Sequence, residues 1–193
     1  MAIKINSHDE SDKLYFAKIK YGLEVLFINL FKAFFILIFA KFLGILEATI
    51  IIMISFAFIR HYAFGVHAKG SINCTIITSI CFYIGGYIPK LLNITNYEVL
   101  IMFLVTMFLL YLYAPADTEA RPLLGKKFRS KLKRKSIFYG IILIILALCI
   151  NDPYIKFYIS YGALCESFTI TPIIYKLFDR RYRNYEFYKK STN

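Results

Sequence analysis

Charged side chains are scarce in this chain. Only 19% of its 193 residues are charged and 59% are apolar, whereas ordinary soluble domains have about 25% charged and about 45–50% apolar residues. This composition excludes an ordinary soluble domain and indicates an integral membrane protein.

Paired cysteines are also missing. The four cysteines lie within or at the ends of apolar runs, and none forms a CxxC pair. This pattern excludes a disulfide framework and an ordinary zinc ribbon. The cysteines are Cys74, Cys81, Cys149 and Cys165.

The chain also lacks the internal repeat that marks many transporters.

The start of the chain does not show the sequence pattern of a cleavable signal peptide. The first 22 residues are polar, carry Asp9, Glu10 and Asp12, and are not followed by a small-residue cleavage site. We therefore expect the first apolar run to stay in the mature protein. Within this segment, Ser11 to Tyr21 fits either an amphipathic helix on the membrane surface or a solvated tail.

Acidic residues number 12, against 24 Lys and Arg. Such a surplus can indicate a nucleic-acid partner, but here the basic residues occupy short segments between apolar runs. Contact with membrane lipids explains this placement better, so no nucleic-acid partner is expected.

Apolar runs predict an all-α polytopic bundle of six transmembrane helices. A spanning helix usually needs about 17–25 residues, and the second and fifth runs are short by this measure. The six runs are Leu23 to Ala40, Ile45 to Ile59, Ile72 to Ile88, Tyr97 to Ala114, Ile137 to Ile150 and Tyr154 to Phe178.

Charge asymmetry predicts how this bundle is oriented. If all six runs span, 20 Lys and Arg residues fall on one side and three on the other, with Lys32 inside the first span. The positive-inside rule then places both termini and the segment from Arg60 to Cys74 in the cytoplasm. We expect one membrane domain over 1–193, divided into an N-terminal segment (1–22), the bundle (23–178) and a basic tail (179–193), with a basic cytoplasmic loop at 115–136.

A thiol and an imidazole lie close together in the sequence, at the edge of the third apolar run. Cys74 follows His67 by seven residues, which is roughly 10.5 Å of rise on an unbroken helix. A helix break near Gly70 would let His67 fold back towards a Cys74 in the first turn of the next helix, where the helix dipole favours a thiolate. The pair then reads as a nucleophile and its base. Alternatively, Cys74 is a small packing residue and His67 an interfacial polar one.

The spacing of Arg60, Gly65, His67-Ala68 and Cys74 resembles the signature of the AgrB family, the accessory gene regulator membrane peptidases of Gram-positive quorum sensing. The resemblance covers most of the chain and includes two later segments in the same order. These segments run from Tyr113-Ala114-Pro115-Ala116-Asp117 to Pro122-Leu123, and from Glu166 to Pro172. The chain departs from the pattern at Phe64, where many members have a second glycine.

The resemblance implies a cysteine endopeptidase that removes the C-terminal tail of an AgrD-type precursor peptide and closes the remainder into a thiolactone. On this chain Cys74 would be the nucleophile and His67 the general base. Arg60 and Gly65 would match further positions that the family needs for activity. No cofactor or metal is implied, and the site would face the cytoplasm at the bacterial cell membrane.

Other polar residues are candidates for supporting roles. Asp117 could orient His67 as the third member of a triad, or it could be a solvated carboxylate at a helix-ending turn. Lys32 and Glu166 are ionisable groups inside apolar runs, where they are costly unless they pair or line a polar interior.

The basic segment that contains Lys126, Lys127 and Arg129 has two compatible interpretations. It can determine topology by lying on anionic headgroups. It can also attract the acidic tail that AgrD-type precursors tend to have.

Two other functions remain open from sequence. A small transporter or peptide exporter subunit would use Lys32 and Glu166 and would not need Cys74. A metal-dependent protease would draw on His61, His67 and Cys74, but no fourth ligand accompanies them. The oligomeric state is open, with a homodimer among the options.

Overall fold

The computed structural model describes residues 2–66, 71–119 and 121–190 and is all-helical apart from its connections. This part of the chain has no β-strand, only isolated β-bridges between single residues. The described helices are α1 (Ala2–Phe42), α2 (Leu46–Ala63), α3 (Ser71–Leu91), α4 (Asn96–Tyr113), α5 (Lys126–Cys149), α6 (Pro153–Thr169), α7 (Pro172–Leu177) and α8 (Asn184–Lys190). The expected all-α class is confirmed.

Helix boundaries follow local sequence signals. Thr95 and Glu98 form a reciprocal capping box that starts α4. The side chain of Asp152 accepts hydrogen bonds from the backbone N–H groups of Tyr154 (2.7 Å) and Ile155 (3.2 Å), and Pro153 opens the helix, so α6 begins there. The residues between the fifth and sixth apolar runs, Asn151-Asp152-Pro153, therefore start a helix.

Helix α6 forms the centre of the bundle and packs against α2, α3, α4 and α5. At its crossing with α2, a side chain on Gly162 would overlap the backbone carbonyl of Ile52. Small residues permit this close approach, as is common between membrane helices. Buried hydroxyl residues join the small ones: Ser160 and Ser167 are fully buried and donate to carbonyls of their own helix.

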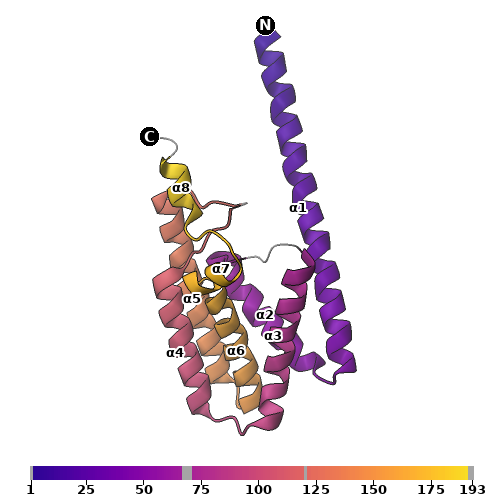
Figure 1. Cartoon of the computed structure of the whole chain (residues 1–193), viewed down its shortest axis with the longest axis vertical. Coiled ribbons are helices and arrows are strands. Elements are labelled where there is room, and N and C mark those ends of the chain that lie inside the picture. The colour runs from indigo at the N-terminus through magenta and orange to yellow at the C-terminus, as the bar shows by residue number, and fades with distance from the viewer. Residues whose placement is uncertain (1, 67–70, 120, 191–193) are drawn as a thin grey trace.

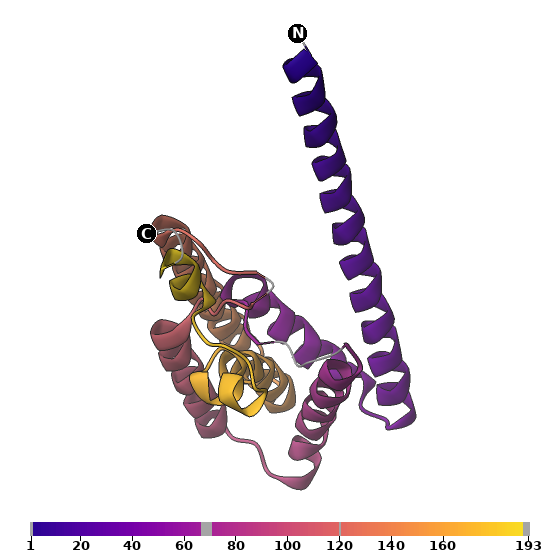
Figure 2. The same cartoon turned by 45° about the horizontal axis from the view of Figure 1, so that its top comes forward.

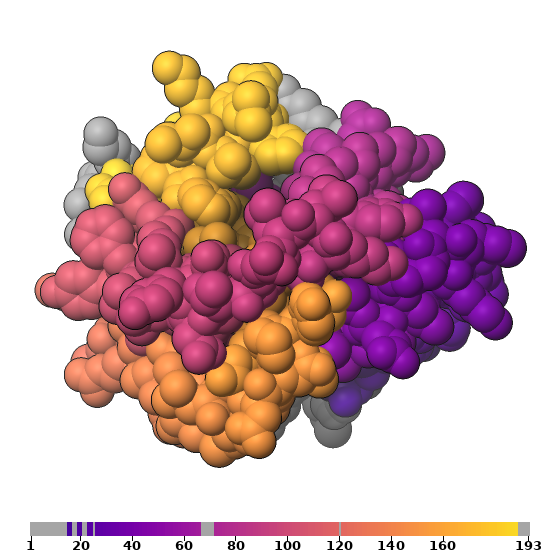
Figure 3. Space-filling model, turned by 90° about the horizontal axis from the view of Figure 1, so that it is seen from below, coloured from indigo at the N-terminus to yellow at the C-terminus, as the bar shows by residue number. Residues whose placement is uncertain are grey.

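The helices alternate in direction, which brings one set of ends together. Figure 1 shows the C-terminal ends of α2, α4 and α6 at the same end of the bundle as the N-terminal ends of α3 and α5. Residues 114–119 and 121–125, α7 and α8 lie at this end too. Viewed from the opposite end (Figure 3), the magenta α3–α4 connection crosses the middle of the face.

Helix α1 differs from the others because its first half stands away from the bundle (Figures 1 and 2). Its last turns pack against α2 and α3 through Ile36 and Ala40, which are buried. The polar N-terminal segment and the first apolar run, which we expected to be separate, form this one continuous helix. Large apolar side chains in the first apolar run, such as Phe27 and Phe31, are exposed.

The expectation of six spanning helices requires correction. By length and composition, three of the described helices could cross a membrane: α2, α4 and the Ile72–Leu91 part of α3. Helix α5 has seven Lys and Arg among its first ten residues, which leaves a short apolar part. Helix α6 has 17 residues and carries Lys156 and Glu166, and the predicted run to Phe178 is divided between α6 and α7.

Candidate functional site

Arg60, in the last turn of α2, holds together two helix ends and a turn. Its Nη1 donates to Glu166 Oε2 (3.2 Å) and to Thr169 Oγ1 (2.9 Å) on α6. Its Nη2 donates to the backbone carbonyls of Val66 (2.9 Å) and Gly65 (3.4 Å). We call these five residues the Arg60 cluster. One guanidinium thus ties the end of α6 to the backbone that follows α2.

Burial makes the cluster sensitive to change. Glu166 is fully buried, and the Arg60 side chain is 19% exposed. Removing one partner of a buried ion pair leaves an uncompensated charge and costs about 3–5 kcal/mol. Glu166 Oε1 has no hydrogen-bond partner among the described residues, so the carboxylate depends on Arg60 for its charge partner. Its partner is therefore not Lys32, which is half-buried on α1.

The turn after α2 is also held by the backbone of two other segments. Ala116 donates its N–H to Ala63 O (2.9 Å) and accepts from the N–H of Gly65 (3.1 Å). The N–H of Val66 donates to Thr169 O (3.1 Å). The backbone at 63–66, which directly precedes His67, is therefore fixed on one side by the α4–α5 connection and on the other by the end of α6.

The position of Gly65 has no room for a side chain. Its φ is +124°, a conformation that L side chains rarely adopt. A Cβ there would overlap Thr169 Oγ1 and lie 2.7 Å from Arg60 Nη1. Gly65 is thus required both by its backbone angle and by the close approach of the Arg60 cluster.

Phe64, the position where the chain departs from the family pattern, also has a positive φ of 61°. Glycine adopts such angles without steric cost, so phenylalanine introduces strain here. The Arg121 guanidinium lies 4.9 Å from the centre of the Phe64 ring, which gives the aromatic side chain a compensating contact.

Asp117 is a buried junction between the α4–α5 connection and the C-terminal segment. Its Oδ2 accepts from the N–H groups of Leu123 (3.3 Å) and Tyr185 (2.7 Å), and its Oδ1 accepts from that of Asn184 (2.9 Å). Its backbone carbonyl accepts from the Tyr175 hydroxyl (2.7 Å). The solvated-carboxylate alternative is wrong, because these bonds give Asp117 a structural role within the protein.

Cys74 lies in the first turn of α3, as the sequence predicts, and is half-buried. His67 and Gly70 lie outside the described residues, so the distance between the thiol and the imidazole stays a prediction. The helix boundaries around them are described: α2 ends at Ala63 and α3 runs from Ser71. The structure thus brings Arg60, Gly65 and Glu166 together and places Cys74 on a separate helix.

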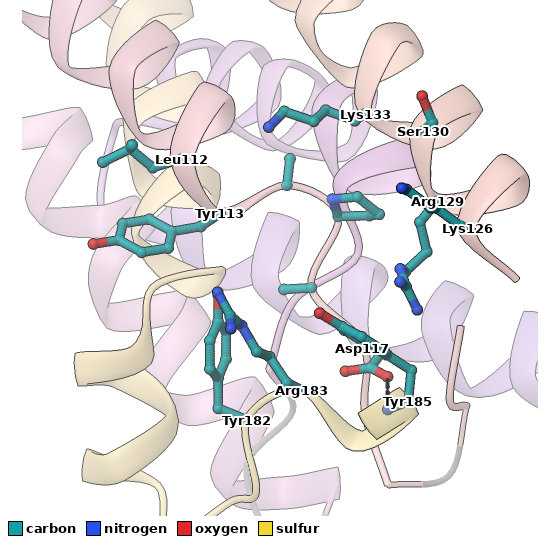
Figure 4. A pocket seen from close by; sticks show the side chains of 13 residues that line it. Leu112, Tyr113, Asp117, Lys126, Arg129, Ser130, Lys133, Tyr182, Arg183 and Tyr185 are labelled. Atoms are coloured by element: carbon teal, nitrogen blue, oxygen red, sulfur yellow. Dashed lines mark hydrogen bonds between the residues drawn. The ribbon is translucent and has the colours of Figure 1, made fainter. Parts of the chain in front are cut away.

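The basic residues predicted to form a loop lie mostly on a helix. Lys126, Lys127 and Arg129 belong to the first turns of α5, and the non-helical connection ends at Gly125. Lys126 and Arg129 line a pocket of about 260 Å³ between the end of α4, the start of α5 and the C-terminal segment (Figure 4), whereas Lys127 does not. We call this the α4–α5 pocket.

Sequence reasoning did not find the C-terminal contacts of this region. Glu119 accepts from the backbone N–H of Arg181 (3.1 Å) and pairs with the guanidinium of Arg180 (3.1 Å). The hydrogen bond from Arg181 and the charge of Arg180 hold the pKa of Glu119 below its usual value. Thr169 and Tyr175 were also missed, although Thr169 lies inside the Glu166 to Pro172 segment that carries the resemblance.

Comparisons with known proteins show the family of this chain. The family model described as Accessory gene regulator B matches residues 1–170. An AgrB-like protein of Clostridium acetobutylicum is 40% identical over 96% of this chain and 88% of its own length. One of Listeria innocua is 38% identical over 93% and 88%.

The accessory gene regulator protein B of Staphylococcus intermedius is 34% identical over 90% of this chain and 91% of its own length. No solved structure gives a significant match. The family match and the near-complete coverage of these relatives show that the chain belongs to the AgrB family, the accessory gene regulator B proteins of quorum sensing.

Proposed function

We propose that this protein is a membrane cysteine endopeptidase that cleaves the C-terminal tail from an AgrD-type precursor and promotes closure of the remainder into a thiolactone. Membership of the AgrB family supports this proposal. The single structural observation that carries it is the position of Cys74 in the first turn of α3, after a turn whose backbone is fixed up to Val66.

The proposed chemistry has two acyl-transfer steps. The Cys74 thiolate attacks the scissile carbonyl carbon, the C–N bond breaks, and the departing amine takes the proton that His67 removed from the thiol. The product is a thioester between Cys74 and the N-terminal part of the precursor. A cysteine thiol of the precursor then attacks this thioester, which forms the thiolactone and releases Cys74.

Helix geometry favours the first step. The first turn of a helix leaves N–H groups without helical partners and carries partial positive charge. Cys74 lies in this turn, where such groups can stabilise the negative charge that develops on the scissile carbonyl oxygen during the attack. The second step must be faster than hydrolysis, so a site at the membrane edge, where water is limited, suits it.

The Arg60 cluster would act on His67 through the backbone. Arg60 donates to the carbonyls of Gly65 and Val66, and Glu166 fixes the guanidinium. Displacing this turn would move the next residue, His67, and a displacement of about 1 Å can cost on the order of 100-fold in rate. Arg60, Gly65 and Glu166 are thus positioning residues in this proposal.

The exposed basic start of α5 would attract the acidic tail of the precursor. Lys126 and Lys127 are exposed and Arg129 is half-buried. Because exposed charges are screened by salt, precursor binding should weaken as ionic strength rises. The same charges favour a cytoplasmic location for this end of the bundle by the positive-inside rule.

Coexpression with the cognate precursor tests the proposal. Mass spectrometry should show tail removal and ring closure with the wild type, and neither product with Cys74→Ala or His67→Ala. The abundance of each variant in the membrane fraction serves as the folding control. Normal processing by a well-expressed Cys74→Ala variant would refute the proposal.

A further inference from the structure

The α4–α5 pocket concentrates positive charge. Four cations line it, Lys126, Arg129, Lys133 and Arg183, and its lining acid is Asp117. The Asp117 carboxylate already accepts three backbone hydrogen bonds. The pocket therefore retains a strong surplus of positive charge that is available to a ligand.

Two of these cations are held in place by aromatic rings. The Arg129 guanidinium stacks 3.5 Å from the centre of the Tyr185 ring, and Lys133 Nζ lies 4.8 Å from that of Tyr111. Arg129 Nη1 also donates to the Leu123 carbonyl (3.4 Å). Ring contacts of this kind orient a cation, and its remaining N–H groups can bind an anion. Figure 4 shows Arg129 and Lys133 on one side of the pocket and Arg183 on the other.

Arg183 is bound only weakly by its acidic neighbour. Its Nη1 lies 3.4 Å from Glu186 Oε1, and both side chains are more than half exposed. Exposed pairs of this kind contribute little. An anion in the pocket can therefore recruit Arg183 from the C-terminal segment as well as the α5 cations.

The surroundings of the pocket are apolar on one side. Leu112 lines the pocket, is 45% exposed, and continues an exposed apolar face of α4 through Phe108 and Leu104. The pocket thus lies where the apolar run of α4 ends, which is the depth of lipid headgroups if α4 spans the membrane.

We propose that the α4–α5 pocket binds the headgroup phosphate of an anionic glycerophospholipid, whose acyl chains lie along the outer face of α4. Basic pockets between membrane helices bind anionic headgroups in this way. The volume of about 260 Å³ suits one headgroup. A polyacidic peptide would satisfy the cations but would leave the adjoining apolar face of α4 uncovered.

Native mass spectrometry of the full chain, extracted from membranes of phosphatidylglycerol and phosphatidylcholine in equal amounts, tests this site. The wild type should retain one phosphatidylglycerol per chain in preference to phosphatidylcholine. Arg129→Gln/Lys133→Gln should weaken this binding by about tenfold or more, as expected for lost charge-assisted bonds.

Lys131→Gln/Arg134→Gln is a matched control. It removes one Lys and one Arg from the same part of α5, but both residues are exposed and neither lines the pocket. It should keep the lipid. Arg183→Gln, outside α5, should weaken binding independently and remains informative if the double variant does not fold.

Equal losses in the pocket and control variants would overturn the proposal, because they would indicate general attraction to a basic surface. Binding of an acidic peptide in the pocket, with no preference for phosphatidylglycerol, would also overturn it and would assign the pocket to the precursor tail. Peptide processing is measured separately, so a failure of this proposal leaves the test of the proposed function unaffected.

Discussion

Gly65→Ala provides a sharp test of the turn that precedes His67. The new methyl group would overlap Thr169 Oγ1 and lie 2.7 Å from Arg60 Nη1, at a φ of +124°. Backbone strain of this kind costs about 1–3 kcal/mol, and overpacking adds about 1–3 kcal/mol. The total of about 2–6 kcal/mol can be relieved only if the turn moves or the Arg60 cluster opens.

Gly44→Ala is the matched control for this substitution. Gly44 has a φ of +66°, but a Cβ there meets no atom within 4 Å. This variant should therefore lose about 1–2 kcal/mol from the backbone alone. It lies in the α1–α2 connection, at the opposite end of α2 from Arg60.

Precursor processing by purified, reconstituted protein is the assay, with a thermal melt of each variant as a stability reading. Gly65→Ala should process more than tenfold slower than wild type, and Gly44→Ala within about twofold of it. Thr169→Ala should partly relieve Gly65→Ala, which a double-mutant cycle would detect as coupling. Equal effects of Gly65→Ala and Gly44→Ala on processing would refute the reasoning.

Three further outcomes are expected. Cys74→Ser should process the precursor far more slowly than wild type at equal abundance, because a hydroxyl ionises much less readily than a thiol; wild-type rates would exclude Cys74 as the nucleophile. Asp117→Ala should lower the free energy of unfolding by about 2–4 kcal/mol, since three backbone N–H groups lose their acceptor; a loss below about 0.5 kcal/mol in a denaturant series would contradict this role. Glu119 has a lowered pKa because of its contacts with Arg180 and Arg181. These contacts stabilise the fold at pH values above the ordinary carboxyl pKa, and this stabilisation is lost as the pH falls through the lowered pKa. The melting temperature of wild type should therefore exceed that of Glu119→Gln at neutral pH and converge with it in acid; a gap that does not depend on pH would contradict the assignment.

Apolar runs were a good guide to where helices lie, but a poor guide to where they begin and end. Helix α5 starts at Lys126, eleven residues before the predicted run at Ile137, because Lys and Arg are good helix formers although they are not apolar. The division between α6 and α7 comes at Pro172, inside a run that hydropathy alone treats as continuous. Counting runs therefore predicted the helical class and overestimated the number of helices apolar enough to span.

The candidate site could be predicted in its residues but not in its contacts. Arg60, Gly65 and Glu166 were identified by family resemblance, whereas their association joins positions 106 residues apart. The sequence paired Glu166 with Lys32 as one option, because both are ionisable groups within apolar runs. Only the crossing of α2 and α6 shows that Arg60 is the partner and that Thr169 completes the cluster.

Asp117 illustrates the opposite case. Its position beside a helix-ending proline suggested a solvated turn or a triad member. Its carboxylate accepts hydrogen bonds from one backbone N–H group of the α4–α5 connection and from two of the C-terminal segment. The latter two belong to Asn184 and Tyr185, which lie 67 and 68 residues further along the chain. No local pattern could indicate that docking.

Trapping the acyl-enzyme tests the central claim most directly. A precursor in which the ring-closing cysteine is replaced by alanine cannot form the thiolactone, so the thioester on Cys74 should accumulate. Intact-mass and peptide mapping of wild type should then show the N-terminal precursor fragment attached to the peptide that contains Cys74, and this adduct should be lost with hydroxylamine. Tail cleavage without any adduct, or an adduct that persists in Cys74→Ala, would contradict the account.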